Sequence, residues 1–585
     1  MKIKNIKYIL FMAAALSLQS CLDLDPQDQL GGDKMWVKAS DYEQFANNFY
    51  TWTTDFSALG NDGSAHSDSR SDLLTYQTPN VTSKGTNTIP TSDGNYSNNY
   101  KHIRRCNLLL QNAENFGRKE DIKQYVGEAH FFRAYSYFDL VQLYGNVILV
   151  TEPIDVSSEK MTATRDDRGD VIDFVISDLQ SAIEELPSNS QISSNEDGRV
   201  SKEAAQAFLS RVALYEGTWQ KFHNNNTERA NALLDIAAKA AKAVMDSKQF
   251  YLFGTQGESV ALGESAQKYM FILENEKSNP AGLQKSANHE YILSRRHDTT
   301  LKPIGWNITK AMVNNSAVQW VTRNFANLYL CSDGLPVDKS PKFKGYAKKA
   351  DEFENRDNRM KYTLLVPGQY YWTGDENPRT TWDDATDIKP AGGNGIIYEG
   401  GGNGTGYANQ KWGSERELTT GKEGYDYPVI RYAEVLLNYA EAVFERNGSI
   451  SDADLNVSLN LVRCRVNPDM PKLSNSFVSA NGLDMREEIR RERTIELFQE
   501  CFRLDDLKRW ATAVQTMNQP LLGVKYTGTE YESKWGGTAP SQAKDSEGCL
   551  IMDNNRKWTD KNYLYPIPSD QQQLNPQLGQ NLGWE

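Results

Sequence analysis

The sequence predicts a mainly α-helical protein built from paired helices, and three observations support this fold class. Long segments carry apolar residues at the three- and four-residue spacing of one helix face. Short turns separate most of these segments, so neighbouring helices are expected to pair. Alanine and aromatic residues recur within them, as in LSRVALYEG and LLNYAEA, which indicates helices that approach one another closely. Long loop-rich excursions are expected between the helical parts.

The first half of the chain holds four of the predicted helices. They cover residues 121–144, 168–186, 201–217 and 229–247. The second stops at Pro187, because proline does not continue a helix. The third is predicted to begin after Ser201, a favourable N-cap, and to end at Gly217. The fourth is rich in alanine, as expected where two helices lie close together.

The helical pattern returns at 429–448 after a long gap. Its two faces differ in polarity: Ile430, Ala433, Leu437, Ala440 and Phe444 lie on one, and Arg431, Glu434, Asn438, Glu441 and Glu445 on the other. Gly448 is the predicted C-cap. Residues 452–466 are predicted as the partner of this helix and 484–510 as a further long helix. The pairs resemble tetratricopeptide repeats, whose stacked pairs form a continuous core.

Two stretches between the helical parts differ in composition. Residues 251–316 and 333–428 are rich in glycine, asparagine and aromatic residues, and 54–100 is a further polar region dotted with aromatics. Loops this long are usually functional or disordered, and the tryptophans favour function. We therefore predict four parts: a signal peptide at 1–20, an N-terminal helical region at 21–250, ligand-binding excursions at 251–428, and a C-terminal helical region with a tail at 429–585.

The N-terminus has the pattern of a secretory signal. Three lysines precede an apolar run of 11 residues, Tyr8 to Leu18, which is too short to span a membrane. The sequence LQSC that follows resembles the lipobox of bacterial lipoproteins. That resemblance implies cleavage before Cys21 and acylation of its thiol. The alternative is an ordinary signal peptide with a chance cysteine.

Charge and motifs argue against several classes of function. The net charge is −13, or −16 once the three N-terminal lysines are removed, so a basic surface for nucleic acid is not expected. The five cysteines after Cys21 and the six histidines show no metal-binding spacing, so we predict no metal site and no cofactor. The sequence contains no phosphate-binding glycine motif and no GxSxG nucleophile motif.

Four segments together resemble the SusD/RagB family of outer-membrane lipoproteins of Bacteroidetes. They are AYSYFDLVQLYGNVILVTEP (134–153), YPVIRYAEVLLNYAEA (427–442), IRRERTIELFQECFRLDDLKRW (489–510) and NYLYPIPSDQQQLNPQLGQNLGW (562–584). With the lipobox, they span nearly the whole mature chain in the family's order. The chain departs from the family pattern at Cys501, where glycine is usual, at Cys464, where a small residue is usual, and at Leu582, where proline is usual.

The resemblance implies both a fold and a function. The fold is a set of four tetratricopeptide-like helix pairs, with loop excursions that carry the ligand site. The function is capture of glycans at the outer face of the outer membrane and their delivery to a SusC-like TonB-dependent transporter. Some family members bind peptides instead, and that alternative stays open. The protein is predicted not to be an enzyme, with a glycoside hydrolase on the same scaffold as the rival.

Loop aromatics are the predicted ligand contacts, because sugar rings pack their C–H faces on exposed tryptophan or tyrosine while polar side chains bond the hydroxyls. Trp306 is the first choice, since it lies in a loop beside Gly305, with Arg296 and His297 nearby in sequence. The other candidates are Tyr96, Asp62, Asp68, Arg70, Trp372 and Trp382. The alternative for each aromatic is structural, namely that it fastens a long loop to the scaffold.

Two charged patterns suggest other functions. Glu434 and Glu441 lie two turns apart, about 10 Å along one helix face, and carboxylates at such a separation could serve an inverting glycosidase. We favour the structural alternative, a charged helix face paired with Arg431. From Asp484 to Trp510 there are seven basic and eight acidic residues, a balance that indicates ion pairs between helices rather than nucleic-acid binding.

Overall fold

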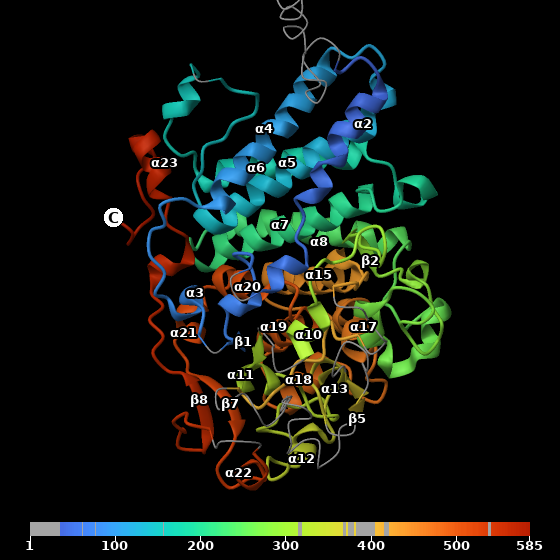
Figure 1. The fold of residues 1–585 in the computed structure, drawn as a ribbon, viewed down its shortest axis with the longest axis vertical. Helices are drawn as coiled ribbons and strands as arrows, with labels where there is room; N and C mark the ends of the chain where they lie inside the picture. Colours follow the sequence, from blue (N-terminus) through green and yellow to red (C-terminus); the bar gives the residue numbers. More distant parts are fainter. Residues whose placement is uncertain are drawn as a thin grey trace, which may run out of the picture.

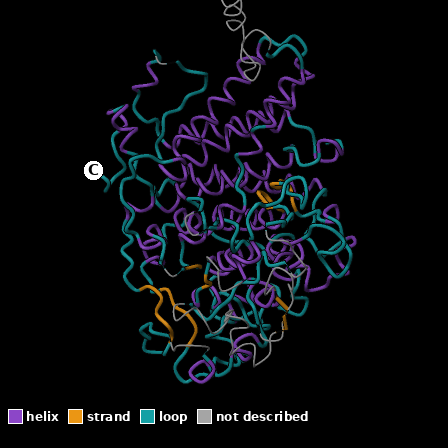
Figure 2. Tube along the Cα trace, in the orientation of Figure 1, coloured by secondary structure: helices purple, strands orange, loops and turns teal. Residues whose placement is uncertain are grey.

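Long helices occupy one half of the molecule, and short helices, hairpins and loops occupy the other (Figures 1 and 2). The computed structural model describes residues 35–60, 63–76, 78–155, 157–313, 319–366, 370–371, 380–381, 404–414, 421–535 and 540–585. Among these residues, no helix is long and apolar enough to cross a membrane.

The long helices of the N-terminal half stack in chain order. They are α2 (Ala39–Asn47), α4 (Gly94–Glu114), α5 (Lys123–Tyr144), α6 (Arg168–Glu185), α7 (Lys202–Phe222) and α8 (Thr227–Ser247). From α4 to α8, each helix packs against the next one (Figure 1). The four helices predicted here are confirmed, and the Ser201 hydroxyl accepts a hydrogen bond from the Ala204 amide at 3.1 Å, as its predicted N-cap role requires.

Helix α7 passes through Gly217, where the sequence predicts its end. A Cβ atom at Gly217 would lie only 2.9 Å from Cγ of Leu234 and 3.2 Å from its amide nitrogen. Glycine therefore lets α8 approach α7 at the centre of their contact. The correction has a simple cause: glycine ends many helices, but here its small size serves packing between two helices.

Helix α15 (Tyr432–Asn447) joins the stack by packing against α8 and α7. Gly448, with φ of +70°, ends it as predicted. Both of its faces are buried, including the predicted polar face that carries Glu434, Glu441 and Glu445. This helix therefore lies inside the protein, with charged neighbours on one side and apolar neighbours on the other.

Two segments predicted as single helices are each divided in two. Residues 484–510 form α19 (Met485–Glu496) and α20 (Arg503–Arg509), and 452–466 form α16 (Asp452–Asn456) and α17 (Leu459–Cys464). Between α19 and α20, Gln499 and Cys501 have φ values of +57° and +67°. This left-handed backbone turns the chain, and it favours glycine, which fits the family preference for glycine at position 501.

The other half of the molecule contains two-stranded antiparallel sheets and short helices. The strand pairs are β1 (Leu74–Thr75) with β3 (Trp320–Val321), β2 (Tyr291–Arg295) with β6 (Tyr427–Arg431), β4 (Tyr370–Tyr371) with β5 (Thr380–Thr381), and β7 (Leu521–Lys525) with β8 (Cys549–Asp553). The short helices there are α3 (Val81–Lys84), α9 (Ala266–Tyr269), α10 (Ile308–Val313), α11 (Arg323–Ala326), α12 (Lys349–Phe353), α13 (Asn358–Thr363), α18 (Asn475–Ala480), α21 (Ala513–Met517) and α22 (Tyr531–Lys534). The short helix α23 (Ser569–Leu574) lies instead beside the long N-terminal helices (Figure 1). The predicted loop-rich character of 251–316 is confirmed.

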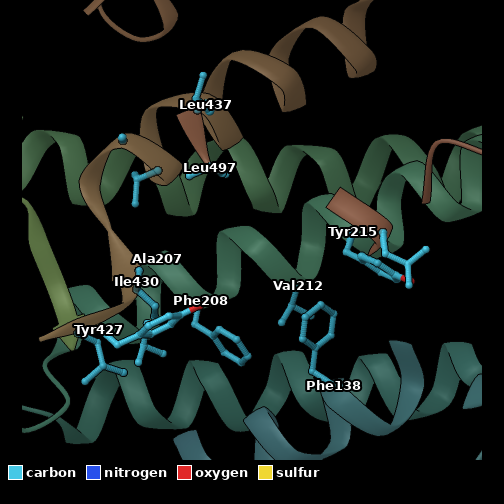
Figure 3. Packing of buried hydrophobic residues seen from close by; sticks show 14 of the residues in the cluster. Phe138, Ala207, Phe208, Val212, Tyr215, Tyr427, Ile430, Leu437 and Leu497 are labelled. Atoms are coloured by element: carbon cyan, nitrogen blue, oxygen red, sulfur yellow. The ribbon is translucent and has the colours of Figure 1, made fainter. Parts of the chain in front are cut away.

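A single large hydrophobic cluster joins the two halves. In Figure 3, Phe208 of α7 lies near Tyr427 and Ile430 of β6 on one side, with Phe138 of α5 on the other, and Leu437 of α15 lies beyond them. Strand β6 leads directly into α15 and pairs with β2, so it ties the loop-rich half to the helical stack. The predicted boundaries at 250 and 428 thus fall within one continuous core, and the division into parts stays a prediction about composition.

Candidate functional site

Arg296 and His297 follow β2 and point to different environments. The His297 side chain is buried, and its Nε2 atom lies 2.8 Å from Oδ1 of Asp55. Arg296 reaches the surface, where its Nη1 atom lies 2.6 Å from Oδ2 of Asp197 and its Nε atom 3.4 Å from Oδ2 of Asp426. Burial acts to raise the pKa of Asp55, but the hydrogen bond and charge of His297 outweigh it and lower that pKa. His297 therefore holds the loop, whereas the Arg296 side chain is partly open to solvent.

Two hollows lie on either side of Arg296. One has a volume of about 380 Å³ and is lined by Tyr291, His289 and Asn288, and we name it the Tyr291 hollow. The other has a volume of about 350 Å³ and is lined by Tyr50 and Lys302, and we name it the Lys302 hollow. Both contain many hydrogen-bonding side chains, and each offers the edge or face of an aromatic ring. Such a lining suits a polar ligand with several hydroxyl groups.

Trp306 is half-buried and packs against the main hydrophobic cluster. Its indole Nε1 atom is buried without a hydrogen-bond partner among the described residues. Its loop is held on both sides, because the Ile304 amide donates to the Glu423 carbonyl and the Thr309 amide to the Glu423 carboxylate. Trp306 lines neither hollow. Only part of its ring is free, so its predicted role as the main sugar platform stays a proposal.

Three of the other candidates have structural contacts. Tyr96 is 4% exposed and lies between the rings of Tyr100 and Tyr144, each with its centroid 5.1 Å away. Asp68 is 2% exposed, accepts the Gln499 amide at 2.7 Å, and has a pKa raised by burial to about 7. The structure therefore places Tyr96 and Asp68 out of reach of a surface ligand, whereas the predicted role required exposure.

Arg70 is tied to its surroundings in the same way. Its Nη1 atom donates to the Thr82 hydroxyl at 3.0 Å and the Tyr565 hydroxyl at 3.2 Å, and its Nη2 atom donates to the Gly63 carbonyl at 3.1 Å. These contacts join the 63–70 loop to the C-terminal tail. The remaining candidates Cys21, Asp62, Trp372 and Trp382 lie outside the described residues and stay predictions.

Glu434 and Glu441 are both engaged by arginines from neighbouring helices. Glu434 accepts two hydrogen bonds of 2.7 Å from Arg211 of α7. Glu441 accepts bonds of 2.6 and 2.8 Å from Arg509 of α20 and one of 2.6 Å from the Trp510 indole. The prediction that Arg431 pairs with these two glutamates was wrong, because the Arg431 side chain bonds other glutamates. The structural interpretation of the two carboxylates is supported, since neither faces an open cleft.

The sequence analysis missed an aromatic pair on the loop-rich half. Tyr76 and Trp320 are both half-buried, with ring centroids 5.3 Å apart and an angle of 54° between the planes. Trp320 lies in β3 opposite Thr75 of β1, so the sheet fixes the two rings side by side. Alternation in the sequence could not locate this pair, because the polar Gln319 is buried while the apolar Trp320 is half-exposed, the reverse of the usual pattern. The pairing with Tyr76 had no signal in the sequence.

The arrangement is suited to binding a polar ligand. Tyr76 and Trp320 offer a rigid apolar surface for a sugar face, and the hollows around Arg296 offer hydrogen bonds and charge. Among the described residues, no group of three histidine, cysteine, aspartate or glutamate side chains is placed to hold a metal ion.

Two sequence profiles match the chain. The profile of the SusD family matches residues 278–584, and one described as starch-binding and associating with the outer membrane matches residues 22–214. SusD-like protein P2 of Formosa agariphila is 24% identical over 522 residues, which is 86% of this chain and 90% of that protein. SusD-like protein P25 of the same organism is 28% identical over 245 residues, and the match spans only 44% of its length.

Solved structures share the fold. A SusD-like carbohydrate binding protein from Bacteroides fragilis superposes with a TM-score of 0.71 at 22% identity, covering 93% of this chain and 99% of that one. Surface glycan-binding protein A from Bacteroides fluxus superposes with a TM-score of 0.58 at 18% identity, covering 94% and 100%. At these identities the likeness shows the fold, and the mainly α architecture with helix pairs is confirmed.

Proposed function

The chain belongs to the SusD family, and we propose that it captures oligosaccharides or polysaccharides at the cell surface and delivers them to a SusC-like TonB-dependent transporter. The supporting observation is the Tyr76–Trp320 pair, two half-exposed rings held by a two-stranded sheet. Strands β1 and β3 fix the rings before a ligand arrives, so little side-chain freedom is lost on binding.

The Trp320→Ala variant tests this proposal. We expect its affinity for the glycan that the wild type selects from a polysaccharide panel to fall at least about tenfold, or about 1.4 kcal/mol. The matched control is Trp52→Ala, since Trp52 is also half-buried and stacks on His102 at 4.1 Å, but in the helical half. Isothermal titration should show unchanged binding for the control. Equal affinities of wild type and Trp320→Ala would mean that the Tyr76–Trp320 pair does not contact the glycan.

Trp306 is retained as a second proposed contact. Because its ring is half-buried against the core, we expect Trp306→Ala to lower the melting temperature as well as the affinity. If the loss of binding only matches the loss of folded protein, Trp306 has a structural role and does not contact the ligand.

We propose further that the protein binds without hydrolysis and that a lipid on Cys21 anchors it. The carboxylates of Glu434 and Glu441 are paired with arginines, so the chain length of a bound polysaccharide should not change on incubation. The Cys21→Ala variant should leave the membrane fraction, since acyl chains supply anchoring in proportion to their buried length. Selection of peptides over glycans in the same binding panel would favour the peptide-binding alternative.

A further inference from the structure

The two hollows around Arg296 adjoin one another, and together we name them the trough. They share six lining residues: Asp197, Gly198, Arg199, Leu293, Ser294 and Arg296. Leu293 and Ser294 belong to β2, which runs past both hollows. The Asp197–Arg296 ion pair is common to both hollows and lies at their junction. A ligand longer than one hollow must therefore meet this ion pair.

Gly198 allows Arg296 to take this position. Its φ is +95°, and a Cβ atom there would lie 3.3 Å from Cγ and 3.5 Å from Nη1 of Arg296. The arginine stem thus lies against bare backbone. Asp197, next in the chain, is 68% exposed and Arg296 is 45% exposed. An ion pair with this exposure contributes little to stability, because water solvates both partners, so it can exchange partners readily.

The lining of the trough is close to balanced in charge, although the whole chain has a net charge of −13. The cations that line it are Arg199, Lys285, Arg295, Arg296 and Lys302, and the acids are Glu43, Glu196, Asp197 and Asp426. Most of these charges are already engaged. Arg199 bonds both oxygens of Glu128, at 2.8 and 2.9 Å, and Lys285 bonds Asp426 at 2.5 Å.

Lys302 differs from the other cations of the trough. Among the described residues, its ammonium group has no hydrogen-bond or ion-pair partner. Partial burial, followed by the charge of Arg295, lowers the pKa of Lys302, as expected for an ammonium group with a positive neighbour. Within the described part of the chain, the trough therefore presents one unpaired cation, Lys302, and one cation, Arg296, that has two acid partners. Of these two, Asp197 is exposed and replaceable, whereas Asp426 is largely buried.

We propose that this trough binds an acidic sugar unit of a glycan, whose carboxylate or sulfate group replaces Asp197 on Arg296 while Lys302 supplies a second positive charge. The guanidinium fork suits either anion. The inference rests on the proposed glycan-binding function and adds a ligand class and a second contact region, separate from Tyr76 and Trp320.

The test compares charged and neutral forms of the same sugar chain by isothermal titration at low ionic strength. The probes are tetragalacturonate with its fully methyl-esterified form, and a sulfated galactan tetrasaccharide with its desulfated form. We expect wild-type protein to bind at least one anionic probe about tenfold more tightly than its neutral form, and added salt to weaken that preference. The pair that shows the preference identifies the anion. The proposal is overturned if neither anionic probe is preferred.

Three variants separate this proposal from a structural role of the ion pair. Arg296→Gln and Lys302→Gln should abolish most of the preference, whereas Asp197→Asn should strengthen binding of the anionic probe severalfold because it removes the competing carboxylate. If the ion pair had only a structural role, Asp197→Asn would weaken binding of the anionic probe as much as Arg296→Gln. The matched controls are Arg229→Gln and Asp173→Asn, which break an exposed pair of 3.0 Å between α8 and α6 and should change nothing.

Failure of this proposal is distinguishable from failure of the proposed function. Loss of neutral-glycan binding in Trp320→Ala reports on the aromatic pair. The preference for the anionic probe over its neutral form, and the loss of this preference in Arg296→Gln, report on the trough. A protein that binds neutral glycans through Trp320 but shows no preference for either anionic probe would keep the proposed function and exclude an acidic ligand.

Discussion

The charges around Arg431 and those around Arg296 contrast in burial and in bonding. Arg431 is 1% exposed and donates five hydrogen bonds of 2.6–2.9 Å to Glu290, Glu496 and Glu500. Arg465 bonds Glu290 and Glu496 as well. Around Arg296, by contrast, the ion pair with Asp197 is open to water.

The difference concerns what each set of charges can do. Charges buried without a partner cost several kcal/mol, so every member of the Arg431 network must keep its place. Exposed charges lose little when they change partners. The buried network is therefore suited to holding β2, β6 and α19 together, and the exposed charges are suited to meeting a ligand. Three substitutions test this contrast between buried and exposed charges, and they follow in decreasing order of effect. The second is at Glu441, another buried carboxylate.

The largest effect is expected from Arg431→Met. The substitution leaves three buried carboxylates without this cation, and we expect the free energy of unfolding to fall by about 3–5 kcal/mol. Urea unfolding measures the loss. Because buried unpaired carboxylates favour protonation, the deficit should shrink as the pH is lowered. Arg446→Gln is the control, since Arg446 forms a partly exposed pair with Asp235 at 2.9 Å, and a loss as large as that of Arg431→Met would contradict the contrast.

Glu441→Gln should have an intermediate effect that depends on pH. Burial acts to raise the pKa of Glu441, but the charge and hydrogen bonds of Arg509 outweigh it and lower that pKa to about 2. The folded pKa lies below the ordinary value of 4.5, so the ionised group stabilises the fold at neutral pH, and this contribution is lost as the pH falls from about 4.5 to about 2. At neutral pH the variant should be less stable by about 2–3 kcal/mol.

Acid unfolding of the two proteins checks this expectation. The wild type should lose stability across that pH range more steeply than Glu441→Gln, and the two curves should converge at the acidic end. Parallel curves would mean that Glu441 does not titrate as described. Glycan affinity at neutral pH should be the same in both proteins, and a large loss of binding would bring back the enzymatic alternative for Glu434 and Glu441.

The smallest effect is expected from Arg296→Gln. Its pair with Asp197 is solvated, so we expect the free energy of unfolding to change by less than about 1 kcal/mol. Thermal melting at neutral pH measures it, with Asp197→Asn in parallel. A drop comparable to that of Arg431→Met would mean that the trough is part of the scaffold and would erase the distinction between the two regions.

Local patterns in the sequence were sufficient to locate the helices and to identify the family. The spacing of apolar residues located α5, α6, α7, α8 and α15, because helical periodicity is a property of a few consecutive turns. Ser201 and Gly448 marked helix ends for the same local reason. The balance of charge at 484–510 correctly indicated ion pairs between helices, although it could not say which ones.

The contacts between residues that are distant in the chain became known from the folded structure alone. Glu441 meets Arg509, Arg431 meets Glu290, and Tyr76 meets Trp320, in each case from segments far apart in the chain. The sequence predicts a helix end at Gly217, but in the folded protein this glycine makes room for Leu234. The sequence predicts Tyr96 as a loop aromatic, but it lies in α4 and is buried in the folded protein. Burial and pairing depend on which distant segments meet, and a short stretch of sequence carries no record of that, whereas helical spacing is complete within the stretch itself.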